Sequence, residues 1–177
     1  MIRTVSQIKD ELADREAIRD CLYRYSRGAD RCDEELVRSA YWPDAIDDHM
    51  AFSGTREELI AWMMPIMKGG MDQTQHIIGN ILIQLHGAVA NVESYFYGFH
   101  RIRGEDGKPR DTIGAGRYLD RFERRGDEWR IARRTVITDW FRDYPDSADW
   151  EKGPFNMQVP PGGRHPDDPS YVFFAAP

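Results

Sequence analysis

Asp30 and His76 have the side chains and the surroundings that proton-transfer chemistry needs. Asp30 ends a helical pattern that begins near Ala17, and His76 lies among apolar residues in the strand-like run 74–80. A carboxylate that holds one imidazole N–H fixes the tautomer of the ring and stabilises the imidazolium formed when the other nitrogen takes a proton. We therefore predict that Asp30 and His76 meet as a catalytic pair, with His76 as the general base and Asp30 as the acid that orients it.

The helix that must carry Asp30 is amphipathic. Its apolar positions recur at the spacing of one helical face: Ile18, Leu22, Tyr25 and Ala29. We expect residues 3–12 to form a separate helical turn, with Asp14 as the cap of the helix that follows. Asp33 is better placed than Asp30 to cap the next helix, predicted at about 33–41, which leaves Asp30 free for the histidine.

The rest of the chain changes from helix to strand. Thr55 and Glu58 form a capping-box signature at the start of a helix that ends near Lys68–Gly70. Four strand-like segments follow, near residues 74–86, 88–100, 112–124 and 128–142, and glycine-containing turns separate them. Gly114–Gly116 lies inside one of them and predicts a bend in the sheet. Helices followed by a strand meander predict an α+β protein.

Length and composition exclude several classes of protein. The 177 residues predict a single domain over 1–177, whose last part, about 145–177, is a C-terminal tail. A net charge of −6 argues against nucleic acid as a partner, and no apolar run approaches the ~20 residues of a membrane span. Cys21 and Cys32 form no CxxC motif and no secretory signal is visible, so we expect a cytoplasmic protein with reduced thiols.

The order of these features resembles the SnoaL-like branch of the nuclear transport factor 2 superfamily. The resemblance rests on Asp30 after the first helix, Trp42–Asp44 after the second, His76 on a strand, and Gly126–Ile131 before the last strand. It covers about residues 10–145 and is greatest to the group of hexachlorocyclohexane dehydrochlorinase, bile-acid dehydratase and scytalone dehydratase. It implies a cone-shaped, curved antiparallel sheet wrapped against N-terminal helices around an internal pocket, and a homotrimeric assembly.

The resemblance also implies roles for individual residues. Asp30 and His76 fall on the acid–histidine dyad of the family, Tyr25 falls on a pocket position, and Arg134 falls on an arginine that faces the pocket. Tyr25 stands where the dehydrochlorinase has a lysine, and the pair of pocket histidines of scytalone dehydratase is not clearly matched. From the residues alone, Tyr25 is either a proton donor or a core tyrosine, and Arg134 either neutralises anionic charge or is an exposed strand arginine like Arg130.

The pocket itself should be apolar. We expect it to be lined by aromatic and methionine side chains, namely Tyr41, Trp42, Trp62, Met63 and Phe96. Such a lining predicts a hydrophobic or aromatic small molecule as the substrate. Asp47, Asp48 and His49 do not predict a metal site, because adjacent residues of a strand point to opposite faces. We therefore expect neither a metal nor a cofactor.

Together these features predict a cofactor-independent lyase. His76 would abstract a proton, and water, formaldehyde or another small group would leave a bulky aromatic or multi-ring molecule. An isomerase or a polyketide-cyclase-like aldol catalyst on the same site is one alternative. A non-catalytic ligand-binding protein, or a subunit like the β chain of ring-hydroxylating dioxygenases, is another. A homotrimer is predicted because several apolar side chains, including Val136, Trp140, Phe141 and Tyr171–Phe174, have no obvious place inside one chain.

Overall fold

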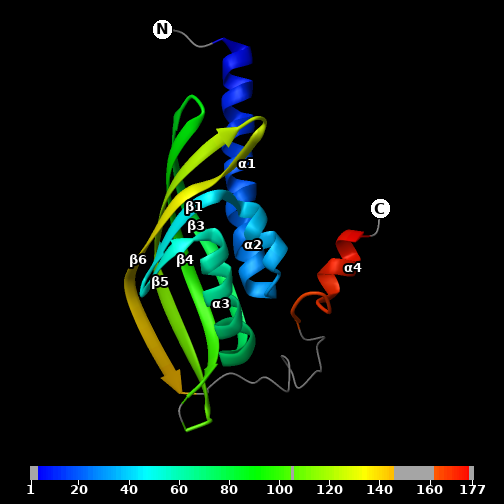
Figure 1. Ribbon diagram of the computed structural model, residues 1–177, viewed down its shortest axis with the longest axis vertical. Helices are drawn as coiled ribbons and strands as arrows, with labels where there is room; N and C mark the ends of the chain where they lie inside the picture. Colours follow the sequence, from blue (N-terminus) through cyan, green and yellow to red (C-terminus); the bar gives the residue numbers. More distant parts are fainter. Residues whose placement is uncertain (1–3, 105, 146–161, 176–177) are drawn as a thin grey trace, which may run out of the picture.

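The computed structural model describes residues 4–104, 106–145 and 162–175. Three helices cover one face of a long, curved sheet, and a fourth lies beside the first two (Figure 1). The helices are α1 (Val5–Arg31), α2 (Glu34–Ala40), α3 (Arg56–Gly70) and α4 (Pro169–Ala175). The strands are β1 (Tyr41–His49), β2 (Phe52–Thr55), β3 (Met71–His86), β4 (Val89–Arg103), β5 (Pro109–Arg125) and β6 (Glu128–Pro145). The predicted α+β class is confirmed.

Helix α1 is continuous from its start to Arg31. Thr4 caps it in a capping box with Gln7, so the prediction of a separate first turn, followed by a second helix with Asp14 as its cap, was wrong. Asp14 instead accepts a hydrogen bond of 2.7 Å from the indole of Trp129, which ties the middle of the helix to the sheet. The first turns extend beyond the sheet (Figure 1), and their apolar side chains, such as Leu12, are exposed.

Helices α2 and α3 begin where the sequence predicts. Asp33 caps α2 by accepting a 3.1 Å hydrogen bond from the backbone of Leu36, and Thr55 and Glu58 form the capping box of α3. Because Asp33 takes the capping position, Asp30 is available elsewhere.

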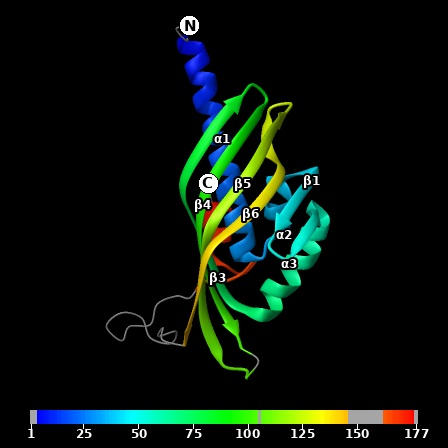
Figure 2. The same ribbon diagram turned by 90° about the vertical axis from the view of Figure 1, so that its left-hand side faces the viewer.

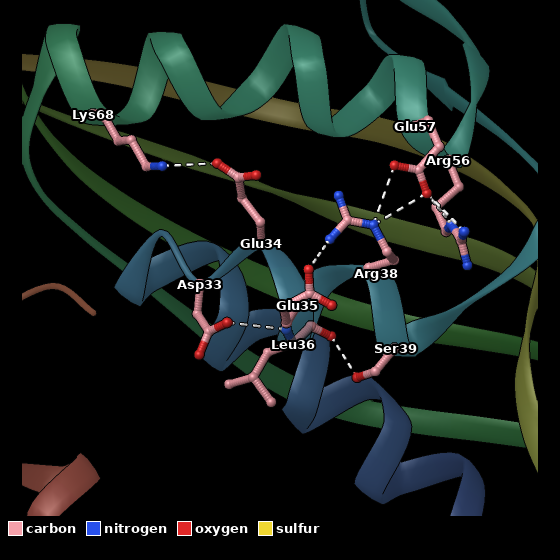
Figure 3. A network of polar contacts seen from close by, with 9 residues as sticks. All are labelled: Asp33, Glu34, Glu35, Leu36, Arg38, Ser39, Arg56, Glu57 and Lys68. Carbon is pink, nitrogen blue, oxygen red and sulfur yellow. Dashed lines mark hydrogen bonds and ion pairs between the residues drawn. The ribbon is translucent and has the colours of Figure 1, made fainter. Parts of the chain in front are cut away.

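Exposed ion pairs join α2 to α3 (Figure 3). Lys68 of α3 reaches Glu34 at 2.8 Å, and Arg38 of α2 reaches Glu57 at 3.1 Å. Each exposed pair contributes little to stability, about 0–1 kcal/mol. The pairs lie at opposite ends of α3 and so hold its register against α2, while the apolar side of α3 faces the sheet.

The sheet has the strand order β2-β1-β6-β5-β4-β3. Strands β3 to β6 form the predicted antiparallel meander, and Figure 2 shows them bending along their length. A wholly antiparallel sheet was expected, but β1 pairs with β6 in parallel, so the sheet is mixed. Strand β1 begins at Tyr41, directly after α2, and an irregularity between Tyr41 and Ile46 accommodates Pro43.

The meander has four register shifts, two between β3 and β4 and two between β5 and β6, and such shifts change which side chains face the helices. The pairing of β5 with β6 shifts at Gly116, where an added Cβ would lie 1.9 Å from the carbonyl oxygen of Ile137. This confirms the bend predicted at Gly114–Gly116. A second shift, between Ile78 and Ile81 on β3, reverses the inward and outward alternation beyond it.

The described part of the C-terminal segment packs against the end of α1. The backbone N–H of His165 donates to the carbonyl of Arg31 at 2.7 Å, and the Tyr171 hydroxyl donates to Asp33 at 2.7 Å. The three residues that follow Tyr171, Val172–Phe174, are exposed. Residues 146–161 of the predicted tail lie outside the described residues. None of the described helices is long and apolar enough to cross a membrane.

Candidate functional site

Asp30 and His76 meet where the last turn of α1 approaches the start of β3. The backbone N–H of His76 donates to one oxygen of the Asp30 carboxylate at 2.8 Å, and the ring Nδ1 lies 2.7 Å from the other oxygen. An ionised carboxylate can only accept, so this contact assigns the proton to Nδ1 and leaves Nε2 with a free lone pair. Both side chains are largely buried, at 11% and 14% exposure.

The environment keeps Asp30 ionised. Burial of the carboxylate opposes ionisation, but the hydrogen bonds from the ring and backbone of His76, together with the charge that His76 can carry, outweigh it. The pKa of Asp30 is therefore lowered from its ordinary value. A carboxylate in this state stabilises the imidazolium that would form if Nε2 took a proton.

His76 borders a cavity of about 90 Å³ between α1, α3 and the sheet. Its lining is mostly apolar with three histidines: Tyr25, Ala29, His49, Met50, Trp62, Met63, Ile66, Met67, Met71, His76 and His100. The volume is below the roughly 300–1,000 Å³ of pockets for drug-sized ligands. Four of the lining residues are methionines, whose flexible side chains can shift to admit a larger molecule.

His100 of β4 is the nearest histidine neighbour described for His76. The two rings lie 5.2 Å apart in an edge-on arrangement. Burial, with the charge of His76 as the next cause, lowers the pKa of His100 to about 4, so His100 is neutral at neutral pH. Gly98 makes this approach possible, because a Cβ there would lie 3.0 Å from His100 and 3.4 Å from His76.

The approach of His100 to His76 was not predicted from the sequence. His76 pairs across the strands with Gly98 and His100 pairs with Thr74, so the two histidines are diagonal neighbours. The alternation of residues along a strand places His100, Gly98 and Phe96 on one face of β4. This pattern could have predicted that His100 lies near His76.

Tyr25 reaches the cavity from α1, as predicted. Its ring packs edge-on against Tyr41 and Tyr118, with centroids 5.7 and 5.9 Å away. Burial raises the pKa of Tyr25 to about 12, although the nearby Arg134 charge opposes the rise. The phenol therefore keeps its proton and can act as a hydrogen-bond donor.

Arg134 is not among the residues that line this cavity. Its side chain is fully buried and makes two hydrogen bonds, of 2.8 and 2.7 Å, to the equally buried Asp120. Its guanidinium lies over the rings of Tyr25 and Tyr118, 4.3 and 3.9 Å from their centroids. Arg134 thus contacts Tyr25, which lines the cavity, without lining the cavity itself. Arg133, on the opposite face, reaches Asp48 at 2.6 Å.

Of the five residues expected to line the cavity, Trp62 and Met63 do so. The other three use their side chains elsewhere. The Tyr41 hydroxyl donates to Asp47, and the Trp42 indole donates to the carbonyl of Glu123 near the end of β5. Phe96 is partly buried and stacks on Tyr118, with a centroid distance of 4.6 Å.

A larger groove, of about 380 Å³, lies on the sheet face away from the helices. It is bordered by exposed side chains such as Leu82, Leu119 and Arg121, and it contains neither Asp30 nor a histidine. Among the described residues, no group of three or more His, Cys, Asp or Glu side chains is placed to hold one metal ion.

A curved sheet backed by helices is the arrangement of the cystatin-like fold, and a protein of that fold from Nostoc punctiforme is 19% identical, with a TM-score of 0.59 over 78% of this chain and 96% of that one. Residues 10–135 match the SnoaL-like domain, and the chain belongs to this family.

Solved structures show the same fold. A scytalone dehydratase-like protein from Novosphingobium aromaticivorans is 24% identical, with a TM-score of 0.69 over 80% of this chain and 94% of that one. The hexachlorocyclohexane dehydrochlorinase LinA type 3 from Novosphingobium barchaimii is 19% identical, with a TM-score of 0.70 over 86% and 98%. A protein from Novosphingobium aromaticivorans that carries the name of an aromatic ring hydroxylase is 22% identical, with a TM-score of 0.66 over 75% and 94%. Comparison with curated protein sequences gives no match.

Proposed function

We propose that this protein is a cofactor-independent lyase that removes a proton from a small aromatic molecule and expels a neighbouring group, by dehydration or by loss of formaldehyde. One observation carries the proposal. Asp30 holds Nδ1 of His76, and the ring borders a mostly apolar cavity. This is the arrangement that a general base requires, because the tautomer is fixed and Nε2 is left to take a proton.

The steps follow from the residues at the cavity. Nε2 of His76 takes the proton, and the carboxylate of Asp30 stabilises the imidazolium that results. The neutral phenol of Tyr25 donates a hydrogen bond to an oxygen of the substrate, where negative charge develops. Arg134 supports Tyr25 from behind rather than contacting the substrate.

The size and lining of the cavity define the class of substrate. Trp62 and the methionines offer an aromatic and adaptable surface, and about 90 Å³ suits one compact ring system better than the multi-ring molecule first expected. The names of two neighbours, a dehydratase-like protein and a dehydrochlorinase, support an elimination reaction.

Nitrobenzisoxazole tests the base directly. Removal of its ring proton breaks the N–O bond and releases a coloured cyanonitrophenolate, with no other reactant. We expect wild-type protein to open the ring and His76→Ala to lose about 10²–10⁴-fold of the rate, the typical contribution of a general base. Asp30→Asn should also lose activity. His86→Ala is the matched control, because His86 ends the same strand and is exposed.

A His76→Ala variant that keeps most of the rate would refute the proposal. Wild-type protein that binds the probe without opening it would instead favour a ligand-binding protein. An isomerase or aldol catalyst would convert its natural substrate without change in mass. The neighbour named for a ring hydroxylase supports a dioxygenase subunit as a second candidate, which would co-purify with a larger iron-containing chain.

We also propose a homotrimer. The sheet face away from the helices carries exposed apolar side chains on one paired row, with Ile77, Tyr97 and Trp140 on β3, β4 and β6. A row of this kind is suited to burial between subunits, because contiguous exposed apolar surface is rare on monomers.

A further inference from the structure

A second carboxylate–histidine pair, Asp47 and His49, lies on β1. The two residues are separated by one position, so both point toward the interior, while Asp48 between them points outward to Ser53 and Arg133. Asp47 is fully buried, and the His49 side chain is 14% exposed. The prediction that adjacent residues here face opposite ways is therefore confirmed, and it brings the alternate pair together.

The pair is arranged around the Asp47 carboxylate. One oxygen accepts a 2.7 Å hydrogen bond from the Tyr41 hydroxyl, and the other lies 3.4 Å from Nδ1 of His49. Neither that oxygen nor Nδ1 has a hydrogen-bond partner among the described residues. Catalytic hydrogen bonds are often long in an empty site and shorten when a ligand binds.

His49 borders the same cavity as His76 and His100, and its ring packs 5.9 Å from that of Trp62. Because Nδ1 is directed to Asp47, Nε2 on the other edge of the ring is the nitrogen that can reach a molecule in the cavity. The cavity thus carries two histidines that are each paired with a carboxylate, one on β1 and one on β3.

The Asp47 carboxylate is held in place from two sides. It accepts the hydrogen bond of the Tyr41 hydroxyl, and it is the register partner of Arg134 where β1 pairs with β6. Arg134 makes both of its described hydrogen bonds to Asp120. A carboxylate fixed in this way can orient the ring of His49 through Nδ1.

We propose that His49 is the proton donor of this site and that Asp47 is the residue that positions it. His49 gives its Nε2 proton to the oxygen of the leaving group while His76 takes the carbon-bound proton. This inference rests on the proposed lyase function, and it names the residue that supplies the proton taken up by the leaving group.

The protons balance without a further reactant. One C–H bond and one carbon–oxygen bond break, a carbon–carbon double bond forms, and the leaving oxygen departs as water. His76 ends the step protonated and His49 ends it neutral. A proton passed from His76 to His49 through water in the emptied cavity restores the starting state.

Two probes with different leaving groups separate the roles. Nitrobenzisoxazole releases a weakly basic phenolate, whereas unsubstituted benzisoxazole releases a more basic one that depends more on proton donation. His49→Gln should lower the rate for the unsubstituted probe at least about tenfold more than for the nitro probe, because general acid catalysis typically supplies 10²–10⁴-fold. His76→Ala should lower both rates by a similar factor.

Asp47→Asn should show the same selective loss on the unsubstituted probe to a smaller degree. Asp48→Asn is the matched control, because it removes the adjacent carboxylate, which faces outward, and it should leave the ratio of the two rates unchanged. Thermal unfolding of each variant checks that it is folded.

Equal losses on both probes in His49→Gln would overturn the donor role and leave the general base intact. If His76→Ala lost rate selectively on the unsubstituted probe and His49→Gln did not, the donor role of His49 would be overturned, because the two roles would be reversed. Full activity in His76→Ala would refute the proposed function itself, so the two failures are distinguishable.

Discussion

The buried, neutral His100 should make the protein lose stability in weak acid. Burial lowers its pKa from 6.5 to about 4 in the folded chain. Between pH 6.5 and about pH 4, His100 binds a proton in the unfolded chain but not in the folded chain. The free energy of unfolding therefore falls as the pH falls through this range. At 1.36 kcal/mol per pH unit, the loss amounts to about 3 kcal/mol between pH 7 and pH 4.

Urea unfolding at pH 7 and at pH 4 measures this loss. The wild-type protein should lose about 3 kcal/mol more than His100→Gln over this range, since glutamine has no proton to gain. His86→Gln, which changes an exposed histidine, should behave like the wild type. Asp30, whose pKa is lowered, also begins to lose its contribution as the pH approaches 4, but it is present in both proteins, so its effect cancels in the difference between them. Parallel losses in wild type and His100→Gln would refute the argument.

Three further perturbations test the fold and the assembly. Gly116→Ala should destabilise by about 1–3 kcal/mol, because its Cβ would collide with the backbone of β6, whereas Gly114→Ala meets nothing within 4 Å; equal melting temperatures would contradict this. Arg134→Met should cost about 3–5 kcal/mol by leaving Asp120 charged and unpaired, and adding Asp120→Asn should restore part of the loss in urea unfolding. Mass photometry should find three copies of the 20.6 kDa chain, and Trp140→Glu should shift them to monomers; a wild-type monomer would exclude the assembly.

The sequence determined the features that depend on neighbouring residues. Capping of α2 by Asp33 and of α3 by Thr55 follows from side chains that bond to backbone groups within three positions, so both were predictable. The glycine-containing turns between strands are equally local, and they predicted the meander of β3 to β6. Asp30 and His76 were named from their types and a family resemblance, and the structure places them in hydrogen-bond contact.

Tertiary structure decided what depends on residues far apart in the chain. The parallel pairing of β1 with β6 joins segments about ninety residues apart, and no local pattern encodes it. That pairing brings Asp47 and His49 to the interior, while the cross-strand register places His100 beside His76. The family resemblance implied that Arg134 faces the pocket. In the structure Arg134 on β6 is instead held in the core by Asp120, its register partner on β5. A buried charge is stable only where an opposite charge lies next to it, and the folded chain determines where that is.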